Sequence, residues 1–436
     1  MKRYLAIDLG ASNGRHIVGW SDGKEILTDK VYGFENGVMT TKDGLVWDIE
    51  GIFTHVLEGI KVALQKYPDI ESVAIDTWGV DYVRFKGDEP QFPCFSYRDE
   101  RTFASSEAVH KIIPFNKIFE KAGIMYNNFN TVYQLYDDLI KGRLDGVTDF
   151  LSIPEYLNYK LTGVKKKEYT FATTTSLVNA YTKQFDLSLT DALGFPKEMF
   201  KPLYQPGEVV GYFKQDVVNY VGKNLPVVMC ASHDTASAVE GIPIKELDGP
   251  YLSSGTWSII GVKSDIPHTD KTSLEQEFSN EGGVGYIRYQ KNTMGMWIVQ
   301  SLRKELCPDK DYSQIALEAS ESDYDVVIDV NDQIFFSPKS MKVAIDEFLS
   351  KKGLPPAKTH ADYFKCAYVG IAHGYKQAMK GLQSCTGKTY DKIYIVGGGA
   401  KNQFLNALTE SICNVSVVAY PIEATALGNI KIQMER

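Results

Sequence analysis

The sequence predicts an α/β fold made of two similar domains that face one cleft. Short apolar segments typical of buried strands alternate with longer segments in which apolar residues recur every three or four positions, as in amphipathic helices. Two apolar strands joined by a turn of small residues open the chain at residues 4–20. The same arrangement returns at residues 251–262, which indicates a duplicated domain.

The bulk composition is that of an ordinary globular protein. The chain has 436 residues, of which 44% are hydrophobic and 23% charged, enough for two or three domains with a real core. A net charge of −8 disfavours nucleic acids and anionic membranes as partners. Six scattered cysteines without a CxxC pair argue against zinc and disulfides and fit a reducing cytoplasm. We expect no signal peptide and no membrane span, because the first apolar run ends at Asp8 and no apolar run approaches the length needed to cross a bilayer.

The first turn has two interpretations. Asn13-Gly14 is typical of a plain β-hairpin. The turn also consists of small residues that leave backbone N–H groups open to an anion such as a phosphate: Gly10, Ala11, Ser12, Asn13 and Gly14. Arg15 adds a guanidinium beside them, and Asp8, at the end of the preceding strand, is suited to hold a hydrated Mg²⁺.

A helix and a strand bring the next candidate residues to a strand end. Asp48 begins an amphipathic helix that continues to Leu64, and residues 72–76 form a buried strand. Trp78 and Gly79 follow this strand directly. The tryptophan either packs in the core or forms a platform on which the C–H face of a sugar stacks.

His233 and Asp234 lie at a junction between a predicted strand, 227–229, and a predicted helix, 235–239. Open α/β sheets bind ligands at such junctions. The carboxylate of Asp234 is interpreted either as a helix cap or as a general base at the mouth of the cleft. The hydroxyl-rich residues 169–175 upstream are not expected to be helical.

A domain boundary is predicted soon after this helix. Gly241-Ile242-Pro243 ends the helix, and residues 247–250 carry a turn signal. Beyond a second small turn at 253–256, the pattern predicts a helix from Asn292, strand-like residues at 324–336 and a long helix at 359–385.

A run of three glycines follows the predicted strand 393–396. Strand, glycines and helix together are similar to a dinucleotide fingerprint, but Asn402 stands where a third small residue is needed, so we do not expect that fold. The bare backbone of Gly397, Gly398 and Gly399 is instead suited to lie against adenine or ribose. A final strand at 415–420 and a helix from Ala424 complete the chain.

These segments resemble the FGGY carbohydrate kinases and, within that family, the rhamnulokinase branch. The matching segments are 8–15, 75–82, 97–99, 129–131, 231–237, 253–257, 280–283 and 396–399. They occur in family order across nearly the whole chain, whereas the first hairpin by itself indicates only the actin-like ATPase superfamily.

The resemblance implies two ribonuclease-H-like (actin-like ATPase) domains flanking a central cleft. Residues 1–242 are expected to hold the sugar, the first phosphate hairpin and the catalytic aspartate, and residues 243–436 to hold the nucleotide. The implied cofactors are ATP and Mg²⁺, with a water-mediated contact from Asp8 to the metal. Asp234 matches the general base, and the sugar contacts are Gly79, His233, Asp234, Thr235 and Asn292. The nucleotide contacts are Ala11, Ser12, Asn13, Gly14, Arg15, Thr256, Gln300 and Gly398.

The implied reaction is the phosphorylation of L-rhamnulose at its C1 hydroxyl by a cytoplasmic monomer or homodimer. Two alternatives are a kinase for a related ketose, such as L-fuculose or L-xylulose, and a sugar-independent actin-like ATPase. Trp78, Gly79 and Asn292 argue against the ATPase, which needs no sugar pocket. The sequence departs from the family pattern in stopping soon after Asn429, and we expect the missing helical segment to leave apolar surface exposed on the second domain.

Overall fold

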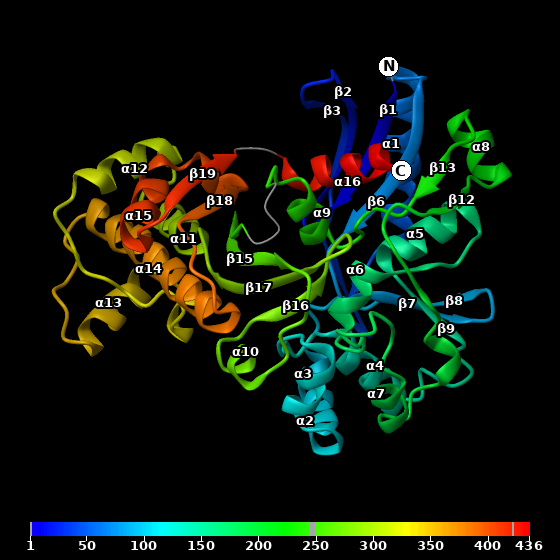
Figure 1. Ribbon diagram of the computed structural model, residues 1–436, viewed down its shortest axis with the longest axis horizontal. Coiled ribbons are helices and arrows are strands. Elements are labelled where there is room, and N and C mark those ends of the chain that lie inside the picture. The colour runs from blue at the N-terminus through cyan, green and yellow to red at the C-terminus, as the bar shows by residue number, and fades with distance from the viewer. Residues whose placement is uncertain (1, 245–248, 421–422) are drawn as a thin grey trace.

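The computed structural model describes residues 2–244, 249–420 and 423–436, arranged in two bodies that each contain a six-stranded sheet (Figure 1). In the first sheet the strand order is β12-β13-β6-β1-β2-β3. Its strands are β1 (Arg3–Leu9), β2 (Asn13–Ser21), β3 (Ile26–Glu35), β6 (Ile70–Thr77), β12 (Val209–Tyr212) and β13 (Pro226–Val228). β1 pairs antiparallel with β2 and parallel with β6, so that Asp8 lies beside Asp76 at the carboxyl ends of two parallel strands.

The helix predicted from Asp48 is confirmed as α1 (Ile49–Lys66). The Asp48 side chain accepts a hydrogen bond from the backbone N–H of Gly51, which satisfies one of the free donors of the first turn. The three- and four-residue spacing then places Ile52, Val56 and Ile60 on one buried face. This packing fixes one side of the first sheet and supports the strand that ends at Asp8.

The second sheet repeats the strand pairing of the first. Its order is β16-β17-β15-β14-β18-β19. The strands are β14 (Tyr251–Ser254), β15 (Trp257–Ser264), β16 (Ser279–Gly282), β17 (Ile287–Met294), β18 (Lys392–Val396) and β19 (Ser416–Tyr420). β14 pairs antiparallel with β15 and parallel with β18, just as β1 pairs with β2 and β6. The duplication expected from the two small turns is therefore present in the topology.

Helices pack on the second sheet and form a helical region beside it. The long helix predicted at 359–385 is α14 (His360–Thr386), whose N-cap Thr359 forms a capping box with Asp362. The other helices of this half are α10 (Lys271–Glu275), α11 (Trp297–Leu306), α12 (Tyr312–Glu321), α13 (Met341–Lys351) and α15 (Gln403–Cys413), with short 3₁₀ turns η4 (Gln333–Phe335) and η5 (Gly398–Lys401).

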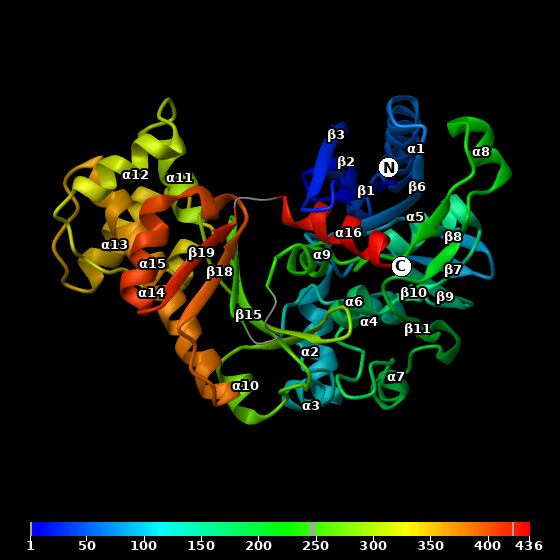
Figure 2. The ribbon, with the colours of Figure 1, turned by 45° about the horizontal axis from the view of Figure 1, so that its top comes forward.

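The last helix, α16 (Ala424–Glu435), returns to the first body, where Figure 2 shows it beside α9 (Asp234–Glu240) and β1. Gln433 Nε2 donates to the Leu5 carbonyl oxygen at 3.1 Å. Gly428 allows the two helices to approach closely, because a Cβ there would lie 1.8 Å from the Ser237 carbonyl oxygen. The division of the chain into two domains at residue 242 stays a prediction. Although α16 lies after that residue in the sequence, it packs on the first body.

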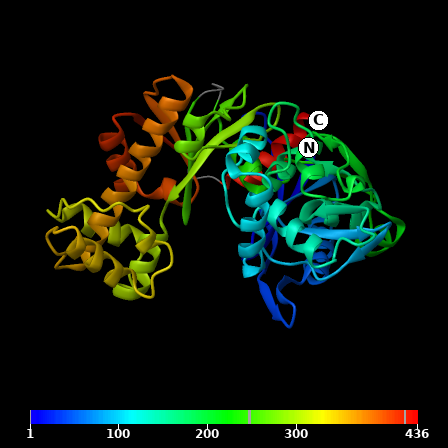
Figure 3. The ribbon, with the colours of Figure 1, turned by 90° about the horizontal axis from the view of Figure 1, so that it is seen from below.

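The long connection between β6 and β13 forms the remainder of the first body. Its elements are β7 (Tyr82–Lys86), β8 (Glu89–Gln91), η1 (Glu100–Thr102), α2 (Phe103–Ile112), α3 (Phe115–Ala122), α4 (Thr131–Ile140), β9 (Asp149–Ser152), α5 (Ile153–Thr162), β10 (Lys167–Glu168), α6 (Tyr169–Ala172), η2 (Thr173–Thr175), α7 (Leu187–Ala192), η3 (Lys197–Met199), β11 (Leu203–Tyr204) and α8 (Gln215–Val221). The two-stranded hairpin β4 (Val38–Thr41) and β5 (Gly44–Trp47) precedes α1. Seen from below, the cyan α2–α3 pair lies beside β16 and β17 (Figure 3), and the Asn280 N–H of β16 donates to the Gly123 carbonyl oxygen at 2.7 Å.

The predictions for two segments are wrong. Residues 169–175 are helical, because the buried Glu168 carboxylate accepts from the backbone N–H groups of Thr170 and Phe171 and so caps the turn. Residues 324–336 form no strand among the described residues. Asp329 and Asp332 accept bonds from nearby backbone N–H groups, an alternative to ladder bonding.

The helix expected from Asn292 begins later. Asn292 lies in β17, and α11 starts at Trp297. Gly295 intervenes at a close approach, since a Cβ there would lie 2.6 Å from the Gly255 carbonyl oxygen. Of the turn predicted at 247–250, residues 247 and 248 lie outside the described residues. Among the helices that the structure describes, none is both long and apolar enough to span a bilayer.

Candidate active site

Asp234 is the first residue of α9, and His233 occupies the N-cap position without a side-chain cap bond. The loop before the helix runs beside the end of β6, where the Thr77 backbone N–H donates to the Ser232 carbonyl oxygen at 2.9 Å. Asp234 Oδ1 accepts from the backbone N–H of Thr235 at 2.5 Å and from its hydroxyl at 3.0 Å. The carboxylate is therefore oriented by its neighbour, and with its side chain 33% exposed it is open to a substrate.

Asp8 and Asp76 form a buried acidic pair near Asp234. Burial raises the pKa of Asp8, Arg15 opposes this, and the charge of Asp234 adds to the rise. Burial also raises the pKa of Asp76 well above 3.8, with a further contribution from Asp8 and opposition from the hydrogen bond of Asn429. The Asn429 amide donates to Asp76 Oδ2 at 2.6 Å. Asp76 Oδ1 has no hydrogen-bond partner among the described residues.

Asp8 and Asp76 could bind a cation together, but they do not by themselves supply all the ligands of a metal ion. Within residues 2–244, 249–420 and 423–436 no group of three or more His, Cys, Asp or Glu side chains is arranged to hold a metal. Mg²⁺, however, usually binds one or two carboxylates and completes its shell with water and substrate phosphates. The Asp76 oxygen without a hydrogen-bond partner and the neighbouring Asp8 carboxylate are oxygen donors of the kind that Mg²⁺ prefers. The residues therefore fit a hydrated Mg²⁺.

The first hairpin is braced through its backbone and presents an exposed tip. The Gly10 N–H donates to the Asn13 carbonyl oxygen at 2.8 Å, and the Asn36 N–H donates to the Ser12 carbonyl oxygen at 3.0 Å. The turn consists of residues 10–12, so Asn13 begins β2 instead of forming the turn. Ser12 and Asn13 are exposed at the tip. Arg15 behind them bridges Asp8 and Glu423, each at 2.5 Å, which places its charge next to the acidic pair.

The second hairpin and the glycine run meet on the other body. Thr256 Oγ1 donates to Gln300 Oε1 at 3.2 Å, which joins two predicted nucleotide contacts. Gly399 packs against the same hairpin, because a Cβ there would lie 2.0 Å from Ser254 Oγ. A Cβ on Gly398 would meet no heavy atom within 4 Å. The backbone of Gly398 therefore faces open space beside the hairpin.

Gly79 lies next to His233. A Cβ on Gly79 would be 3.3 Å from His233 Nε2 and 3.2 Å from Thr174 Cγ2. The Asp81 N–H donates to the Gly79 carbonyl oxygen at 2.9 Å, and Val80 between them has φ of 69°. This is the geometry of a strained γ-turn, a conformation that persists where surrounding contacts impose it.

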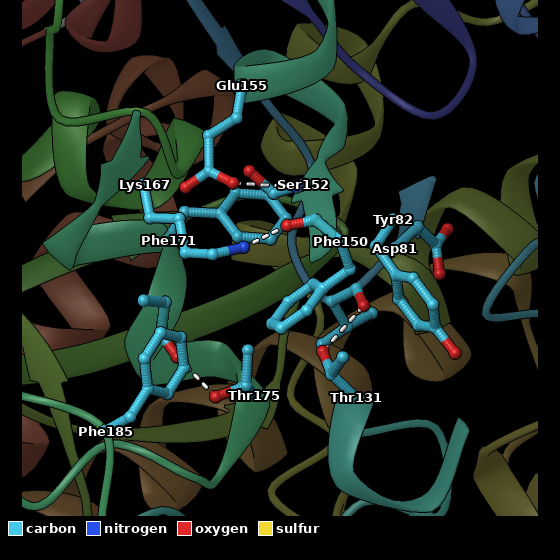
Figure 4. A pocket seen from close by; sticks show the side chains of 12 residues that line it. Asp81, Tyr82, Thr131, Phe150, Ser152, Glu155, Lys167, Phe171, Thr175 and Phe185 are labelled. Atoms are coloured by element: carbon cyan, nitrogen blue, oxygen red, sulfur yellow. Dashed lines mark hydrogen bonds between the residues drawn. The ribbon is translucent and has the colours of Figure 1, made fainter. Parts of the chain in front are cut away.

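Buried hydrogen bonds impose this turn. Thr131 Oγ1 donates to the Val80 carbonyl oxygen at 2.7 Å, and the Val80 N–H donates to Thr174 Oγ1 at 3.1 Å. A small cavity of about 10 Å³ is lined in part by Val80 and Asp81 of the turn (Figure 4). It is large enough for one water at most, so it is not a sugar pocket. A second hollow of about 400 Å³, near Phe348 and His373, includes none of the predicted site residues.

Trp78 packs in the core and is not an exposed sugar platform. Its side chain is 5% exposed and lies against Trp47, with ring centroids 4.3 Å apart. Both indole N–H groups donate to Asp81 Oδ2, at 2.7 Å from Trp47 and 3.0 Å from Trp78. Burial raises the pKa of Asp81 to about 6, and these donors limit the rise. Trp78 therefore braces the γ-turn from behind.

His233 also contacts two residues from the second sheet. Its Nδ1 lies 3.3 Å from Glu281 Oε2 on β16 and 3.3 Å from Arg288 Nη2 on β17. Its Nε2 lies 3.4 Å from Asp234 Oδ1. Glu281, Arg288 and Asp76 are not among the predicted site residues. In the sequence, the segment 280–283 is recognisable only as a family motif.

Asn292 is separated from this cluster. By strand alternation it shares a face of β17 with Arg288, about 14 Å further along the strand. It is exposed and lies opposite Ile259 in the register. No hydrogen bond between described residues joins it to His233 or Asp234. The structure thus brings together Gly79, His233, Asp234 and Thr235 but leaves Asn292 apart.

Comparison with known families identifies the class of protein. The model of the FGGY family of carbohydrate kinases, N-terminal domain, matches residues 3–241, and the model of the C-terminal domain matches residues 251–435. The chain therefore belongs to the FGGY family of carbohydrate kinases. Among solved structures, a xylulose kinase from Lactobacillus acidophilus covers 100% of this chain and 89% of its own, with a TM-score of 0.82 and 18% identity. A Plasmodium falciparum glycerol kinase with ADP has a TM-score of 0.78 and 16% identity, covering 99% of this chain and 89% of its own. These likenesses confirm the expected α/β fold.

Curated relatives resemble the chain along nearly its whole length. A rhamnulokinase from Oceanobacillus iheyensis is 36% identical over 438 residues, covering 99% of this chain and 92% of the relative. A rhamnulokinase from Halalkalibacterium halodurans is 37% identical, covering 99% of this chain and 93% of the relative. A rhamnulokinase from Bacillus subtilis is 36% identical over 99% of this chain and 90% of its own length.

Proposed function

We propose that this carbohydrate kinase transfers the γ-phosphoryl group of ATP to the C1 hydroxyl of L-rhamnulose, giving L-rhamnulose 1-phosphate. The similarity to several rhamnulokinases over nearly the full chain supports this substrate. The observation that carries the proposal is the arrangement of Asp234, His233 and Gly79, because it puts an oriented carboxylate beside bare backbone and an imidazole. A sugar hydroxyl bound there has an acceptor for its proton.

In this mechanism Asp234 accepts the proton of the C1 hydroxyl as the oxygen attacks the γ-phosphorus in line. Thr235 orients the carboxylate through the bonds at 2.5 and 3.0 Å. Gly79, His233 and Thr235 bind the sugar, and Asn292 extends the sugar site along β17. Asn292 lies apart from this cluster on β17, and its proposed contact with the sugar would come from the second half of the chain.

Both hairpins bind the nucleotide. Ala11, Ser12, Asn13, Gly14 and Arg15 direct N–H groups and a guanidinium toward the phosphates, while Thr256, Gln300 and Gly398 contact the nucleoside end. Asp8 would hold Mg²⁺ through water, and Asp76 stands beside it. The ion, when bound, neutralises charge that develops on the phosphoryl oxygens. We propose that residues 1–242 carry the sugar and residues 243–436 the nucleotide, that the enzyme is cytoplasmic, and that it acts as a monomer or homodimer without nucleic-acid or membrane partners.

A substrate panel tests the assignment. We expect kcat/KM to be highest for L-rhamnulose, measurable but weak for L-fuculose and L-xylulose, and zero for glycerol. Burying the terminal methyl of a 6-deoxy sugar contributes about 1 kcal/mol, less than tenfold, so hydroxyl stereochemistry must supply most of the selectivity. Glycerol or xylulose ahead of L-rhamnulose would show that the substrate is wrong, while ADP release without any sugar would contradict the sugar-dependent reaction.

The role of Asp234 is tested separately. Asp234→Asn keeps the size of the side chain, and we expect turnover to fall by roughly 10²–10⁴-fold, the usual contribution of a general base. Folding should survive, because the residue lies at a helix start where Asn is tolerated. Turnover within a few-fold of wild type would exclude it as the base.

A further inference from the structure

The side chain of His233 is held from both halves of the chain. Its Nε2 faces Asp234 of the first body, and its Nδ1 faces Glu281 and Arg288 of the second sheet. Arg288 Nη2 also donates to Glu281 Oε2 at 2.9 Å. The imidazole therefore lies between the proposed base and an ion pair that is contributed by β16 and β17.

The ion pair is buried and well anchored. The Arg288 side chain is 0% exposed and that of Glu281 is 17% exposed. Arg288 Nε donates to the Gly282 carbonyl oxygen at 2.7 Å. Burial alone would raise the pKa of Glu281, but Arg288 and the hydrogen bond to His233 lower it to about 2, so the carboxylate is ionised. Charge-assisted bonds in such a desolvated place hold geometry better than an exposed pair does.

β16 is attached to the first body on both sides of Glu281. The Asn280 N–H donates to the Gly123 carbonyl oxygen at 2.7 Å, and the Gly282 N–H donates to Thr173 Oγ1 at 3.0 Å. A Cβ on Gly282 would lie 2.9 Å from the Cα of Thr170, so the backbones touch. The position of Glu281 next to His233 is thus fixed by the backbone contacts of β16 and does not depend on a flexible side chain alone.

We propose that Glu281 and Arg288 are positioning residues of the kinase reaction. They hold the His233 ring at Nδ1, so that its Nε2 edge faces Asp234 and the substrate hydroxyls. The sugar site is then completed by the second half of the chain, although His233 and Asp234 belong to the first. This inference rests on the proposed function, because it needs His233 to contact the sugar and Asp234 to act as the base.

Glu281→Gln tests the proposal in the full-length protein, with the best ketose of the panel. Glutamine keeps the size and still accepts from Arg288, but it removes the charge that orients the imidazole. We expect kcat/KM for the ketose to fall roughly 10- to 100-fold, the range found when the partner that orients a metal-bound histidine is removed. The KM for ATP should change by less than about threefold, since the nucleotide contacts are elsewhere. Glu277→Gln is the matched control: that side chain is 65% exposed, pairs with Lys291 at 2.9 Å and should leave both values unchanged.

A double-mutant cycle separates positioning from a merely structural role. If Glu281 acts through His233, then adding Glu281→Gln to His233→Asn should cost less than about twofold more in kcat/KM. Additive losses, equal increases in both KM values with a lower unfolding midpoint, or no loss at all would each overturn the proposal. If Glu281→Gln does not fold, Glu281→Asp retains the charge and should give an intermediate loss confined to the ketose. A wild-type turnover in Asp234→Asn would instead overturn the base assignment, independently of this cycle.

Discussion

Gly398 allows a steric test of the nucleotide site that does not disturb the fold. A Cβ at this position meets no heavy atom within 4 Å, and the left-handed φ of the glycine run belongs to Gly397, at 85°. Valine at 398 is therefore compatible with the protein itself. It would obstruct only something that lies against the open backbone, which is where the adenosine of ATP is proposed to bind.

The expected size of the effect follows from the volume that valine adds. A mismatch of a single methylene costs about 1–3 kcal/mol in a shaped pocket, and valine adds three carbon atoms. We expect Gly398→Val to lose about 3 kcal/mol of nucleotide binding, roughly a hundredfold rise in the KM for ATP. The KM for the ketose should stay within about threefold. Steady-state kinetics with each substrate varied in turn, together with thermal unfolding with and without ATP, measure these values.

Gly399→Val is the matched comparison, because it is adjacent but has no space. Its Cβ would lie 2.0 Å from Ser254 Oγ, so the substitution should displace the second hairpin and lower the unfolding midpoint. Equal rises in both KM values for Gly398→Val, with an unchanged unfolding midpoint, would refute the reasoning. So would a stability loss at 398 as large as the loss at 399.

Three further predictions concern stability. Burial raises the pKa of Asp76 in the folded state above its ordinary value of 3.8, so the folded protein loses stability as the pH rises from 3.8 through that raised pKa. Asp76→Asn carries no charge and should therefore unfold at a higher temperature than wild type above about pH 4. Its turnover should fall. Burial raises the pKa of Glu281, but Arg288 outweighs this and lowers the pKa from 4.5 to about 2. The stability that the ionised Glu281 contributes is therefore complete above pH 4.5 and disappears as the pH falls toward 2. The difference in unfolding midpoint between wild type and Glu281→Gln should narrow between those two pH values. Ile430→Ala should destabilise the first body by about 2–5 kcal/mol in denaturant titrations, because Ile430 is fully buried and packs on Gly19, whereas a loss below about 0.5 kcal/mol would contradict the docking of α16.

Local patterns predict those elements whose causes are local. Asp48 caps α1 and Thr359 caps α14 with bonds that reach only three residues along the chain, so both helices can be expected from sequence. The helical turn at 169–175 escapes prediction because the decisive bond comes from Glu168, an acidic side chain whose capping role depends on burial. The pattern places helix α11 too early because the close approach of Gly295 to Gly255 joins residues 40 positions apart.

The candidate site shows the same division. His233 and Asp234 are adjacent in sequence, and their position between a strand and a helix is compatible with either a helix cap or a ligand site, so the choice between them depends on the rest of the chain. Asp76 ends a buried strand like any other, and only its pairing beside Asp8 reveals it. Glu281 and Arg288 act through contacts 48 and 55 residues from His233. Spacing within one segment carries no information about such contacts.

In the proposed function, β17 connects residues around the sugar to residues around the nucleotide. Near its start, Arg288 contacts His233, and at its end Met294 pairs with Trp257, directly after Thr256. These two points are about 20 Å apart along one strand, which pairs with β15 along its whole length and with β16 at residues 287–290. Under the proposals above, a shift of the second hairpin toward the nucleotide would be passed along this strand to the ion pair that contacts His233. In the proposed function this paired strand joins the sugar site to the nucleotide site, and such a link would restrict hydrolysis of ATP when no sugar is bound.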